Sequence, residues 1–476
     1  MSQSDVLIEV SRGSVVAPAG CGKTRLIVDA MCAIRAARPV LILTHTNAGV
    51  SVLRGRLAKS AIHPKSFRVQ TLDGWAMRMV SMFPVRSGVR MSALELRNPG
   101  ADYPEIRRAA VRLVVGGDIS DLLRTTYARV WVDEYQDCNA LQHAMVRGLS
   151  NTLPTVVLGD PLQAIFGFGA NNLPSWEREV CVDFPRAAEL DIPWRWNLAG
   201  APELGQWLLD IRSPLRSGSS IDLSTAPKSV EWIRLTGDVA RDTVLQVGAA
   251  SRRLPGGGGS ALILADSRNP ALQHQFASRT RGAVAVEAVE MRDFISFSDA
   301  VDSARSGAEV LRLTTEIAAK AMTSVRPAEL SDRVEIILKG SARKAPSAVE
   351  RAAVELCRDP SAGLMAALLS ALRANESSRV FRPTLLSACL QMARIGSEQP
   401  SRSYGEVARR IREELRFGLR PVPVRAVGST LLLKGLEADI AVVLDTSPLE
   451  PEHLYVAMTR GAKQLVVCSP TQILLA

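Results

Sequence analysis

A glycine-containing loop near the N-terminus has the sequence Ala17-Pro18-Ala19-Gly20-Cys21-Gly22-Lys23-Thr24. A short apolar run, Ser14-Val15-Val16, comes before it, and residues 25–31 have the character of a helix. A strand, a glycine loop ending in Gly-Lys-Thr and a helix are the pattern of a phosphate-binding loop, in which backbone N–H groups and the helix N-terminus bind phosphate oxygens. The pattern predicts a nucleoside triphosphate site formed by Ala19, Gly20, Cys21, Gly22, Lys23, Thr24 and Arg25.

Lys23 and Thr24 are the two residues of this loop with distinct chemical roles. We expect the Lys23 ammonium to reach the β- and γ-phosphates and the Thr24 hydroxyl to coordinate magnesium. The strict pattern has a glycine six residues before the lysine, where this chain has Ala17. A chance Gly-Cys-Gly-Lys loop is therefore the alternative interpretation, and the acidic segment downstream favours the nucleotide site.

That acidic segment is Asp133-Glu134-Tyr135-Gln136-Asp137, and it follows the apolar run at residues 128–132 directly. A strand that ends in two carboxylates places them at the carboxyl edge of a parallel sheet, where open α/β sheets bind ligands. Hydrolysis of a triphosphate uses such a pair, one carboxylate for magnesium and the other for the attacking water. We predict that Thr24 and Asp133 hold Mg²⁺ and that Glu134 is the general base.

Composition limits the class of protein. With 476 residues, 47% of them hydrophobic, the chain is long enough for more than one globular domain. No apolar run approaches the ~18 residues of a membrane span, and no basic segment followed by an apolar one indicates a secretory signal. The seven cysteines are scattered without a Cys-x-x-Cys pair, which favours a reducing compartment, the cytoplasm, and argues against a zinc or iron–sulfur site. The net charge of +10 suits a polyanionic partner, although arginine-rich genome composition explains it equally well.

Further motifs carry a resemblance to a known family. The acidic segment and the later run Gly159-Asp160-Pro161-Leu162-Gln163-Ala164-Ile165-Phe166-Gly167-Phe168 resemble the UvrD/Rep/PcrA-type helicases of superfamily one. Three more segments resemble later motifs of that family: Leu190-Asp191-Ile192-Pro193-Trp194-Arg195, Lys434-Gly435-Leu436-Glu437-Ala438-Asp439 and Glu452-His453-Leu454-Tyr455-Val456-Ala457-Met458-Thr459-Arg460. Together with the phosphate loop and the segments that begin at His45 and Thr71, motifs in family order extend from residue 17 to residue 460.

The resemblance implies ATP and Mg²⁺ as cofactors and assigns residues to the ATP site. Gln163 belongs to the run that couples ATP to DNA, and Arg195 and Arg460 occupy the two arginine-finger positions, where a planar bidentate donor suits the charge on the γ-phosphate. Trp194 stands in the family's tyrosine position and would stack on adenine, with a core tryptophan as the alternative. Glu437 would meet the ribose. The implied catalytic residues are Lys23, Glu134, Gln163, Arg195 and Arg460.

The resemblance also implies a single-stranded DNA site, formed by His45, Thr46, Asn47, Thr71 and Phe168. Aromatic stacking and phosphate contacts hold single strands without sequence preference; Phe168 stands where the family stacks a base, and His45 replaces a phenylalanine with the same use. Thr71 would face a phosphate. Two departures weaken the expected grip on DNA, because Asp73 replaces a family histidine and would repel a phosphate, and Leu431 replaces another.

The expected fold is α/β, with two RecA-like P-loop domains built on parallel sheets and each interrupted by a helical insertion, as the resemblance implies. Residues 1–188 would form the first domain, with its insertion at about 81–127. Residues 189–299 and 421–476 would form the second, and residues 300–420 its helical insertion. Strand patterns at residues 261–265, 440–444 and 464–468, with Glu189-Leu190-Asp191-Ile192, predict the second sheet. Trp75 and Trp131 are expected in the core.

These expectations combine into an ATP-dependent motor on single-stranded DNA, a UvrD-like helicase or translocase that moves 3′ to 5′ as the family does. A duplex with a 3′ tail is a further expected substrate, a nuclease or other subunit is the expected protein partner, and no membrane partner is expected. The rival interpretation is a DNA-sensing ATPase switch in a larger complex, such as a nuclease–helicase defence system. A P-loop kinase or GTPase is a third interpretation, but it does not explain Gln163, Arg195 and Arg460 in family order.

Overall fold

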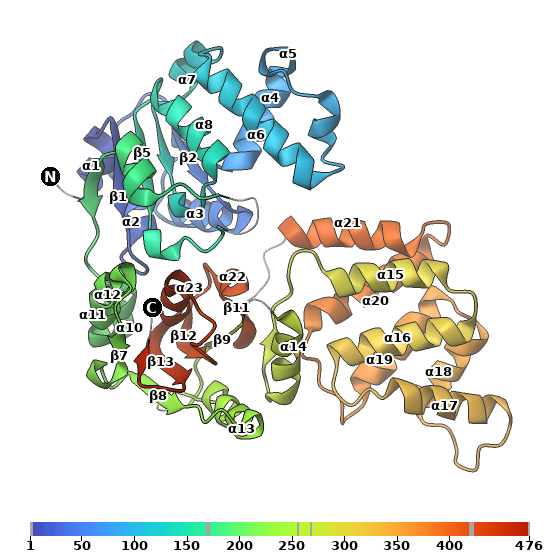
Figure 1. Cartoon of the computed structure of the whole chain (residues 1–476). Helices are drawn as coiled ribbons and strands as arrows, with labels where there is room; N and C mark the ends of the chain where they lie inside the picture. The colour runs from blue at the N-terminus through green and yellow to red at the C-terminus, as the bar shows by residue number, and fades with distance from the viewer. Residues whose placement is uncertain (1–2, 168–171, 255–256, 267–268, 418–422, 475–476) are drawn as a thin grey trace. The chain divides into compact units, whose positions relative to one another are not determined.

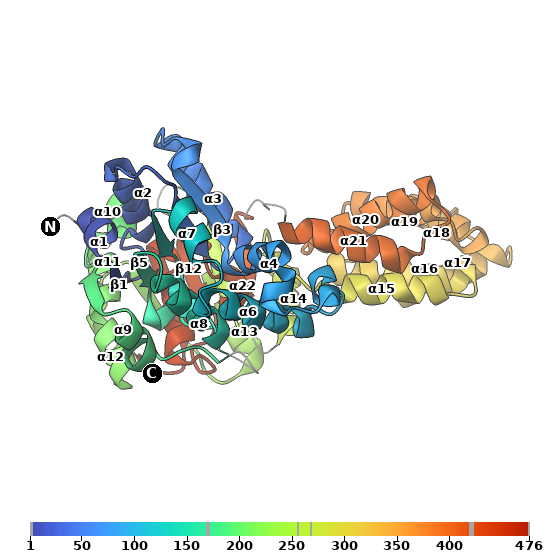
Figure 2. The ribbon, with the colours of Figure 1, turned by 90° about the horizontal axis from the view of Figure 1, so that it is seen from above.

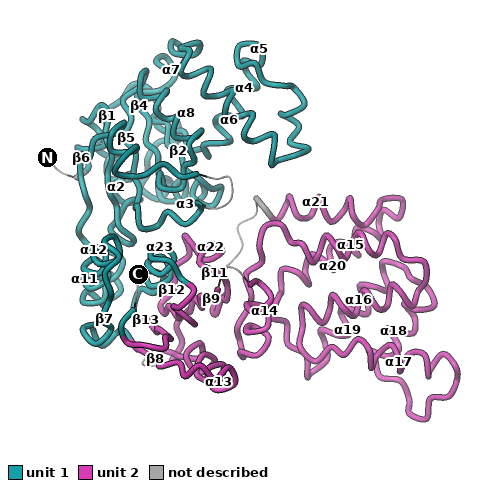
Figure 3. The backbone as a smooth tube through the Cα atoms, in the orientation of Figure 1, with its two compact units in different colours: residues 1–230, 449–463, 473–476 teal, residues 231–448, 464–472 magenta. Residues whose placement is uncertain are grey.

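The computed structural model describes residues 3–167, 172–254, 257–266, 269–417 and 423–474 (Figure 1). The described residues form two six-stranded sheets and a two-stranded one, with helices around them. The chain divides into two compact units, drawn in different colours in Figure 3. The first unit contains residues 1–230, 449–463 and 473–476, and the second contains residues 231–448 and 464–472. Phe168, a predicted DNA contact, lies outside the described residues.

The first sheet has the strand order β3-β2-β4-β5-β1-β6, and all its neighbouring strands pair in parallel. Strands β2, β4 and β5 are buried at every position, so their apolar runs are typical of a parallel sheet that is covered on both faces. The strands are β1 Arg12–Val16, β2 Val40–Thr44, β3 Phe67–Thr71, β4 Arg129–Val132, β5 Thr155–Gly159 and β6 Arg186–Glu189.

Both faces of this sheet pack against helices, because successive residues of a strand point to opposite faces. Leu43 of β2 packs in one core cluster with Trp75, and its neighbour Ile42 packs in another with Trp131. Both tryptophans are fully buried, which confirms their place in the core. The main helices around the sheet are α1 Gln3–Glu9, α2 Lys23–Ala33, α3 Asn47–Lys59, α4 Leu72–Met82 and α8 Ala140–Ser150.

A set of helices between β3 and β4 packs onto α4 and α8. It contains α5 Pro84–Ser87, the 3₁₀ helix η2 Met91–Glu95, α6 Pro99–Val115 and α7 Ser120–Thr126. Arg107 of α6 donates two hydrogen bonds to Asp73 of α4, at 2.7 and 2.6 Å, and Gln142 of α8 donates a third at 3.1 Å. The Asp73 carboxylate, expected to repel a phosphate, is therefore charge-paired and ties these helices together.

The strand predicted from Glu189-Leu190-Asp191-Ile192 was wrong in its place. Strand β6 ends at Glu189 and pairs with β1 at the edge of the first sheet, not in the second. Leu190 is buried in the core cluster that contains Trp131. The reason is that β6 has the composition Arg-Ala-Ala-Glu and is largely exposed, so the apolar residues that follow it gave the stronger strand signal.

The first unit also contains the helices that follow this strand and one helix from the C-terminal part of the chain. These are α10 Trp194–Ala199, α11 Pro202–Asp210, α12 Arg212–Ser217 and α23 Pro451–Met458. Its shorter elements are η1 Pro64–Ser66, η3 Tyr135–Asp137, η4 Pro161–Gln163, η5 Trp176–Val180, α9 Cys181–Asp183, β7 Ile221–Asp222, η6 Leu223–Thr225 and β14 Ile473–Leu474.

The second sheet has the strand order β10-β11-β9-β12-β13-β8, and β9 pairs in parallel with both β11 and β12. Its strands are β8 Val230–Arg234, β9 Ala261–Ala265, β10 Val284–Ala285, β11 Arg425–Ser429, β12 Ala438–Val443 and β13 Gly461–Ser469, which confirms three of the predicted strand patterns. The helices α13 Val239–Ala250, α14 Pro270–Arg279 and α22 Thr430–Leu433 connect them. Two such α/β sheets are the expected pair of RecA-like domains.

A helical bundle lies between β10 and β11 and has a hydrophobic core of its own (Figure 2). It consists of α15 Arg292–Ser303, α16 Gly307–Ala321, α17 Pro327–Leu338, α18 Ala348–Arg358, α19 Ala362–Ala374, α20 Pro383–Glu398 and α21 Tyr404–Phe417. Buried Arg382, which precedes α20, donates to Glu287 at 2.6 and 2.8 Å and to Asp293 of α15 at 2.7 Å. The predicted domain boundaries differ from the limits of the two compact units and stay predictions.

Candidate active site

The phosphate loop connects β1 to α2 and needs glycine at two positions. Gly20 and Gly22 have φ of 70° and 87°, the left-handed region that residues with a Cβ rarely adopt. A Cβ on Gly20 would also lie 2.5 Å from the Trp196 ring, and one on Gly22 would lie 2.9 Å from the Trp194 ring. Ala17, which replaces the first glycine of the strict pattern, is buried, and its N–H donates to Gly159 O at 2.8 Å, so a side chain is tolerated there.

Lys23 lies at the start of α2 and contacts both carboxylates of the acidic pair. Its Nζ is 2.6 Å from Glu134 Oε1 and 3.3 Å from Asp133 Oδ1. Burial disfavours the ammonium charge, but Asp133 and Glu134 outweigh it and raise the pKa of Lys23 above its ordinary value. Burial also raises the pKa of Asp133, whose side chain is only 6% exposed. The loop lysine and the acidic pair predicted from separate motifs therefore form one cluster.

Glu134 has an unusual backbone conformation directly after β4. Its φ of 56° and ψ of 40° are left-handed, a conformation that costs a non-glycine residue roughly 1–2 kcal/mol. The Glu134 N–H donates to Asp133 Oδ1 at 3.0 Å, and Gln136 Nε2 donates to Glu134 Oε2 at 2.6 Å. Strain of this kind clusters at functional sites, and here it turns the Glu134 carboxylate toward Lys23.

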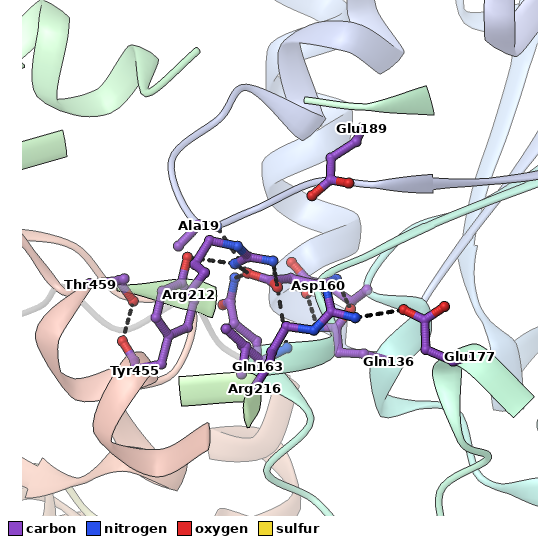
Figure 4. A network of polar contacts seen from close by, with 12 residues as sticks. Ala19, Gln136, Asp160, Gln163, Glu177, Glu189, Arg212, Arg216, Tyr455 and Thr459 are labelled. Carbon is purple, nitrogen blue, oxygen red and sulfur yellow. Dashed lines mark hydrogen bonds and ion pairs between the residues drawn. The ribbon is translucent and has the colours of Figure 1, made fainter. Parts of the chain in front are cut away.

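Asp160, at the end of β5, is the fully buried centre of a hydrogen-bond network (Figure 4). Its Oδ2 accepts from the phosphate-loop N–H of Ala19 at 3.1 Å, and from Gln163 Nε2 at 2.9 Å. The guanidinium of Arg212 donates to both carboxylate oxygens, at 3.0 and 2.9 Å. Gln136 Oε1 accepts from the Asp160 N–H at 3.0 Å. The network joins the phosphate loop to the segment that contains Gln163.

The two candidate finger arginines lie in the same unit as the phosphate loop. Arg460 is 2% exposed; its Nε donates to Val456 O at 2.8 Å, and its Nη2 is 3.5 Å from Gln163 Oε1. Arg195 Nη1 donates to Thr459 O at 2.6 Å, and the Arg195 N–H donates to Gly20 O at 3.1 Å. Gln163, Arg195 and Arg460 are thus connected to one another and to the loop through direct contacts with neighbouring groups.

Trp194 lies beside the phosphate loop and is not a core residue. It is half-buried, and the guanidinium of Arg25 lies 4.6 Å from the centre of its ring. The neighbouring Trp196, in contrast, is 1% exposed and donates its indole N–H to Gly461 O at 2.9 Å. A cation over an aromatic face is the arrangement between which a flat base stacks, so the pair Arg25–Trp194 keeps its predicted role in adenine binding.

The candidate DNA contacts lie near the carboxyl edge of the first sheet. His45 follows β2, and its ring stacks on Phe166 with centroids 6.0 Å apart and an interplanar angle of 27°. Thr46 and Thr71 are the N-caps of α3 and α4, and each hydroxyl accepts a backbone N–H at 3.0 Å. Asn47 is exposed at the start of α3. The two threonines therefore have a structural role, which leaves each hydroxyl hydrogen available as a donor.

Comparison with known proteins assigns the acidic region to a family. Residues 98–175 match the UvrD/REP helicase N-terminal domain, and this segment contains β4, Asp133, Glu134, Asp160 and Gln163. The chain is UvrD-like.

The UvrD-like chain is 37% identical over 75 residues to an ATP-dependent helicase/nuclease subunit from Lacticaseibacillus casei and to its counterpart of the same name from Lacticaseibacillus paracasei. Each match covers 14% of this chain and 6% of the relative, so the chain matches only a small part of the length of these curated relatives. Two solved structures are each 11% identical to it. Pif1 helicase from Candida albicans has a TM-score of 0.42, with 99% of this chain and 95% of that chain covered. A complex of Arterivirus nonstructural protein 10 (helicase) with DNA has a TM-score of 0.29, with 56% and 51% covered.

The donor set of the UvrD-like site fits magnesium better than a metal held by protein alone. In the described part of the chain, no group of three or more His, Cys, Asp or Glu side chains could hold a metal ion. Mg²⁺ takes one or two carboxylates together with phosphate oxygens and water, and Asp133 and the Thr24 hydroxyl at the loop are oxygen donors of this kind. Among the described helices, none has the length and apolar character needed to cross a membrane.

Three site residues receive no role from the sequence, and one predicted residue lies elsewhere. Gln136 and Tyr455 are parts of two of the motifs given above, and Arg212 belongs to none. A buried arginine gives no local signal in a chain with 58 lysines and arginines. Glu437, predicted at the ribose, is exposed just before β12 in the second unit, and its role stays a prediction.

Proposed function

We propose that this UvrD-like chain is an ATP hydrolase that drives movement along single-stranded DNA, in the 3′ to 5′ direction. The observation that carries the proposal is the position of the Lys23 ammonium beside a glycine loop, 2.6 Å from Glu134 and 3.3 Å from Asp133. A lysine, a metal-binding carboxylate and a second carboxylate at one sheet edge are the groups that nucleotide hydrolysis requires.

The residues of the cluster have separate roles in this proposal. Bound Mg²⁺-ATP supplies the triphosphate and the divalent charge that neutralises its oxygens. Lys23 exchanges its carboxylate partners for phosphate oxygens, which releases Glu134 to accept a proton from the attacking water. Asp133 and Thr24 offer oxygen ligands to the metal. The left-handed backbone of Glu134 fixes the direction of its carboxylate before any ligand binds.

The cationic side chains near Gln163 support the hydrolytic role. Arg460 and Arg195 are both anchored by hydrogen bonds to main-chain carbonyl groups, so their guanidinium groups are held in place before the reaction. Preorganised donors of this kind stabilise the charge that develops in the transition state. Gln163 contacts Asp160 on one side and Arg460 on the other, which suits a residue that responds to the nucleotide state.

The stacked pair His45–Phe166 supports the proposed DNA site. Aromatic rings near the carboxyl edge of the sheet, with exposed Asn47 next to them, offer stacking and polar contacts without base readout. Because Phe166 follows Gln163 by three residues, the same short segment reaches both the nucleotide cluster and the proposed DNA site. The direction of movement rests on the resemblance to the family alone.

The proposal is tested by phosphate release with and without single-stranded DNA or RNA. Wild-type protein should hydrolyse ATP faster when DNA is present. The variant Glu134→Gln should bind Mg²⁺-ATP normally and hydrolyse it about 10²–10⁴-fold more slowly, the usual contribution of a general base. Glu203→Gln, at an exposed glutamate of α11, is the matched control. Wild-type turnover by Glu134→Gln would contradict the assignment of the base, and absence of ATP hydrolysis by wild type would contradict the function.

A DNA-sensing ATPase switch within a nuclease–helicase complex is the second candidate function. It is favoured by the name of the two Lacticaseibacillus relatives, which are helicase/nuclease subunits. Displacement of streptavidin from the end of a biotinylated single strand separates the two candidates. A motor displaces streptavidin with ATP present, whereas a switch hydrolyses ATP in response to DNA and leaves the streptavidin bound.

A further inference from the structure

Arg212, the first residue of α12, is a buried arginine outside every motif described above. Its side chain is 8% exposed, and it faces Asp160, whose side chain is fully buried. The geometry points to Arg212 as a positioning residue for the hydrolysis proposed above: it fixes the Asp160 carboxylate, which in turn fixes the phosphate loop and the Gln163 amide. The inference rests on that proposed function and adds to it a residue that touches neither nucleotide nor metal.

The contacts of Arg212 hold its guanidinium on three sides. Nη1 donates to Asp160 Oδ2 at 3.0 Å and Nη2 donates to Oδ1 at 2.9 Å, a bidentate pair. Nη1 also donates to the Tyr455 hydroxyl at 2.7 Å, and the guanidinium lies 5.1 Å from the centre of the Tyr455 ring (Figure 4). Tyr455 is itself fully buried in α23. Burial opposes the charge of Arg212, yet Asp160 and Tyr455 raise its pKa above the ordinary value, so the pair stays ionised.

The Asp160 carboxylate carries this restraint to two functional groups. Its Oδ2 accepts from the Ala19 N–H of the phosphate loop at 3.1 Å and from Gln163 Nε2 at 2.9 Å. Because the Gln163 nitrogen points to Asp160, its Oε1 points the other way, where Arg460 Nη2 lies 3.5 Å distant. A rotation of the carboxylate would therefore release the orientation of the Gln163 amide and with it the contact to the candidate finger.

Only a planar donor can hold the carboxylate in this way. A guanidinium fixes both oxygens and hence the plane of the carboxylate, whereas a lysine ammonium is a point charge around which the carboxylate turns. Arg212→Lys therefore keeps the charge that compensates Asp160 and removes the restraint on its plane. The variant separates positioning from the ordinary requirement that a buried charge has a partner.

The opposing interpretation is that the pair only attaches α12 and α23 to the sheet. In that case, loss of the bidentate geometry lowers stability and changes all nucleotide affinities alike. A positioning role affects the transition state selectively, because Gln163 and Arg460 act on the transferred phosphoryl group while Lys23 and the glycine loop hold the diphosphate. Affinity for a transition-state mimic compared with affinity for ADP distinguishes the two interpretations.

The test measures binding of Mg²⁺-ADP and Mg²⁺-ADP–aluminium fluoride, together with ATP turnover, in the full chain. Arg212→Lys should bind ADP within about 3-fold of wild type, and should lose at least about 10-fold in affinity for the aluminium fluoride complex and in turnover. Tyr455→Phe, which removes one contact of Arg212, should show the same selectivity with a smaller loss. Arg216→Lys is the matched control, because Arg216 lies on α12 as well but pairs with Glu177 at a side chain 40% exposed.

The outcomes are distinguishable. A selective loss in Arg212→Lys with normal behaviour of Arg216→Lys supports the inference. Equal losses for ADP and for the aluminium fluoride complex, or no loss in a folded Arg212→Lys protein, overturn it while the proposed function stands. If circular dichroism shows that Arg212→Lys is unfolded, Tyr455→Phe decides by the same criterion. Failure of wild type to bind nucleotide overturns the proposed function and this inference with it.

Discussion

Replacing Lys23 with methionine should both destabilise the protein without nucleotide and remove most of its affinity for ATP. Methionine keeps most of the apolar chain but lacks the ammonium that lies 2.6 Å from Glu134 and 3.3 Å from Asp133. The two carboxylates are then left side by side without their cation. Asp133 bears most of the cost, because its side chain is only 6% exposed.

The size of the effect follows from burial. Removing one partner of a buried ion pair costs about 3–5 kcal/mol. The Glu134 side chain is 36% exposed and is stabilised by water once Lys23 is lost, so we expect about 2–4 kcal/mol at pH 7. For a unit of roughly 250 residues, this lowers Tm by about 4–16 °C.

The pH dependence has a definite sign. Burial raises the folded-state pKa of Asp133, and Lys23 opposes this, so Lys23→Met raises that pKa further. A carboxyl group with a raised folded-state pKa destabilises the fold increasingly as the pH rises through that pKa. The difference in Tm between wild type and Lys23→Met should therefore be largest at pH 7 and smaller at pH 5.

Thermal unfolding followed by circular dichroism, with and without Mg²⁺-ATP, measures both effects. ATP at 100 times its Kd stabilises wild type by about 2.7 kcal/mol, and it should stabilise Lys23→Met very little. Lys59→Met, at an exposed lysine that ends α3, is the control. If Lys23→Met and Lys59→Met have the same Tm at pH 7 and gain equally from ATP, the assignment of Lys23 is wrong.

Three further predictions follow from the site and the loop. Arg195→Lys and Arg460→Lys should each lower ATP turnover by about 10³-fold or more, the scale of arginine fingers; near-normal phosphate release by both would contradict their role. Gly20→Ala should lower Tm more than Gly218→Ala, because both glycines have φ of 70° but only the Cβ on Gly20 meets a ring, at 2.5 Å; equal Tm values would show that the ring moves aside without cost. The isolated chain should displace streptavidin from single strands but unwind a 3′-tailed duplex poorly at matched salt, since Leu431 replaces a family histidine; efficient unwinding by the monomer would refute this.

The parts of the site that are contiguous in sequence could be predicted from it. The phosphate loop and the acidic pair each lie within eight residues, and a parallel sheet brings the carboxyl ends of its strands to one edge. Lys23 therefore meets Asp133 and Glu134 although 110 residues separate Lys23 from Asp133. Topology alone makes this contact, and two local motifs are sufficient to expect it.

The parts that depend on long-range pairing could not be predicted. Strand β6 is a polar edge strand whose only strong signal is its neighbour β1, and the apolar residues after it indicated a strand in the wrong sheet. The sequence alone predicts that Asp73 repels a phosphate, because Arg107, its partner, lies 34 residues away in an unpatterned segment. In both cases the sequence contains the residue but not the contact that determines its role.

The orientation of the two glutamines is the last feature that only the fold determines. Gln136 donates to Glu134 and accepts from the Asp160 N–H, and Gln163 donates to Asp160 and faces Arg460 with its oxygen. Each amide has one donating and one accepting end, so fixing one end fixes the other. The proposed base and the candidate finger are therefore linked through two oriented amides that meet at Asp160. Arg212 holds the meeting point, which is why a residue outside every motif is expected to affect the reaction.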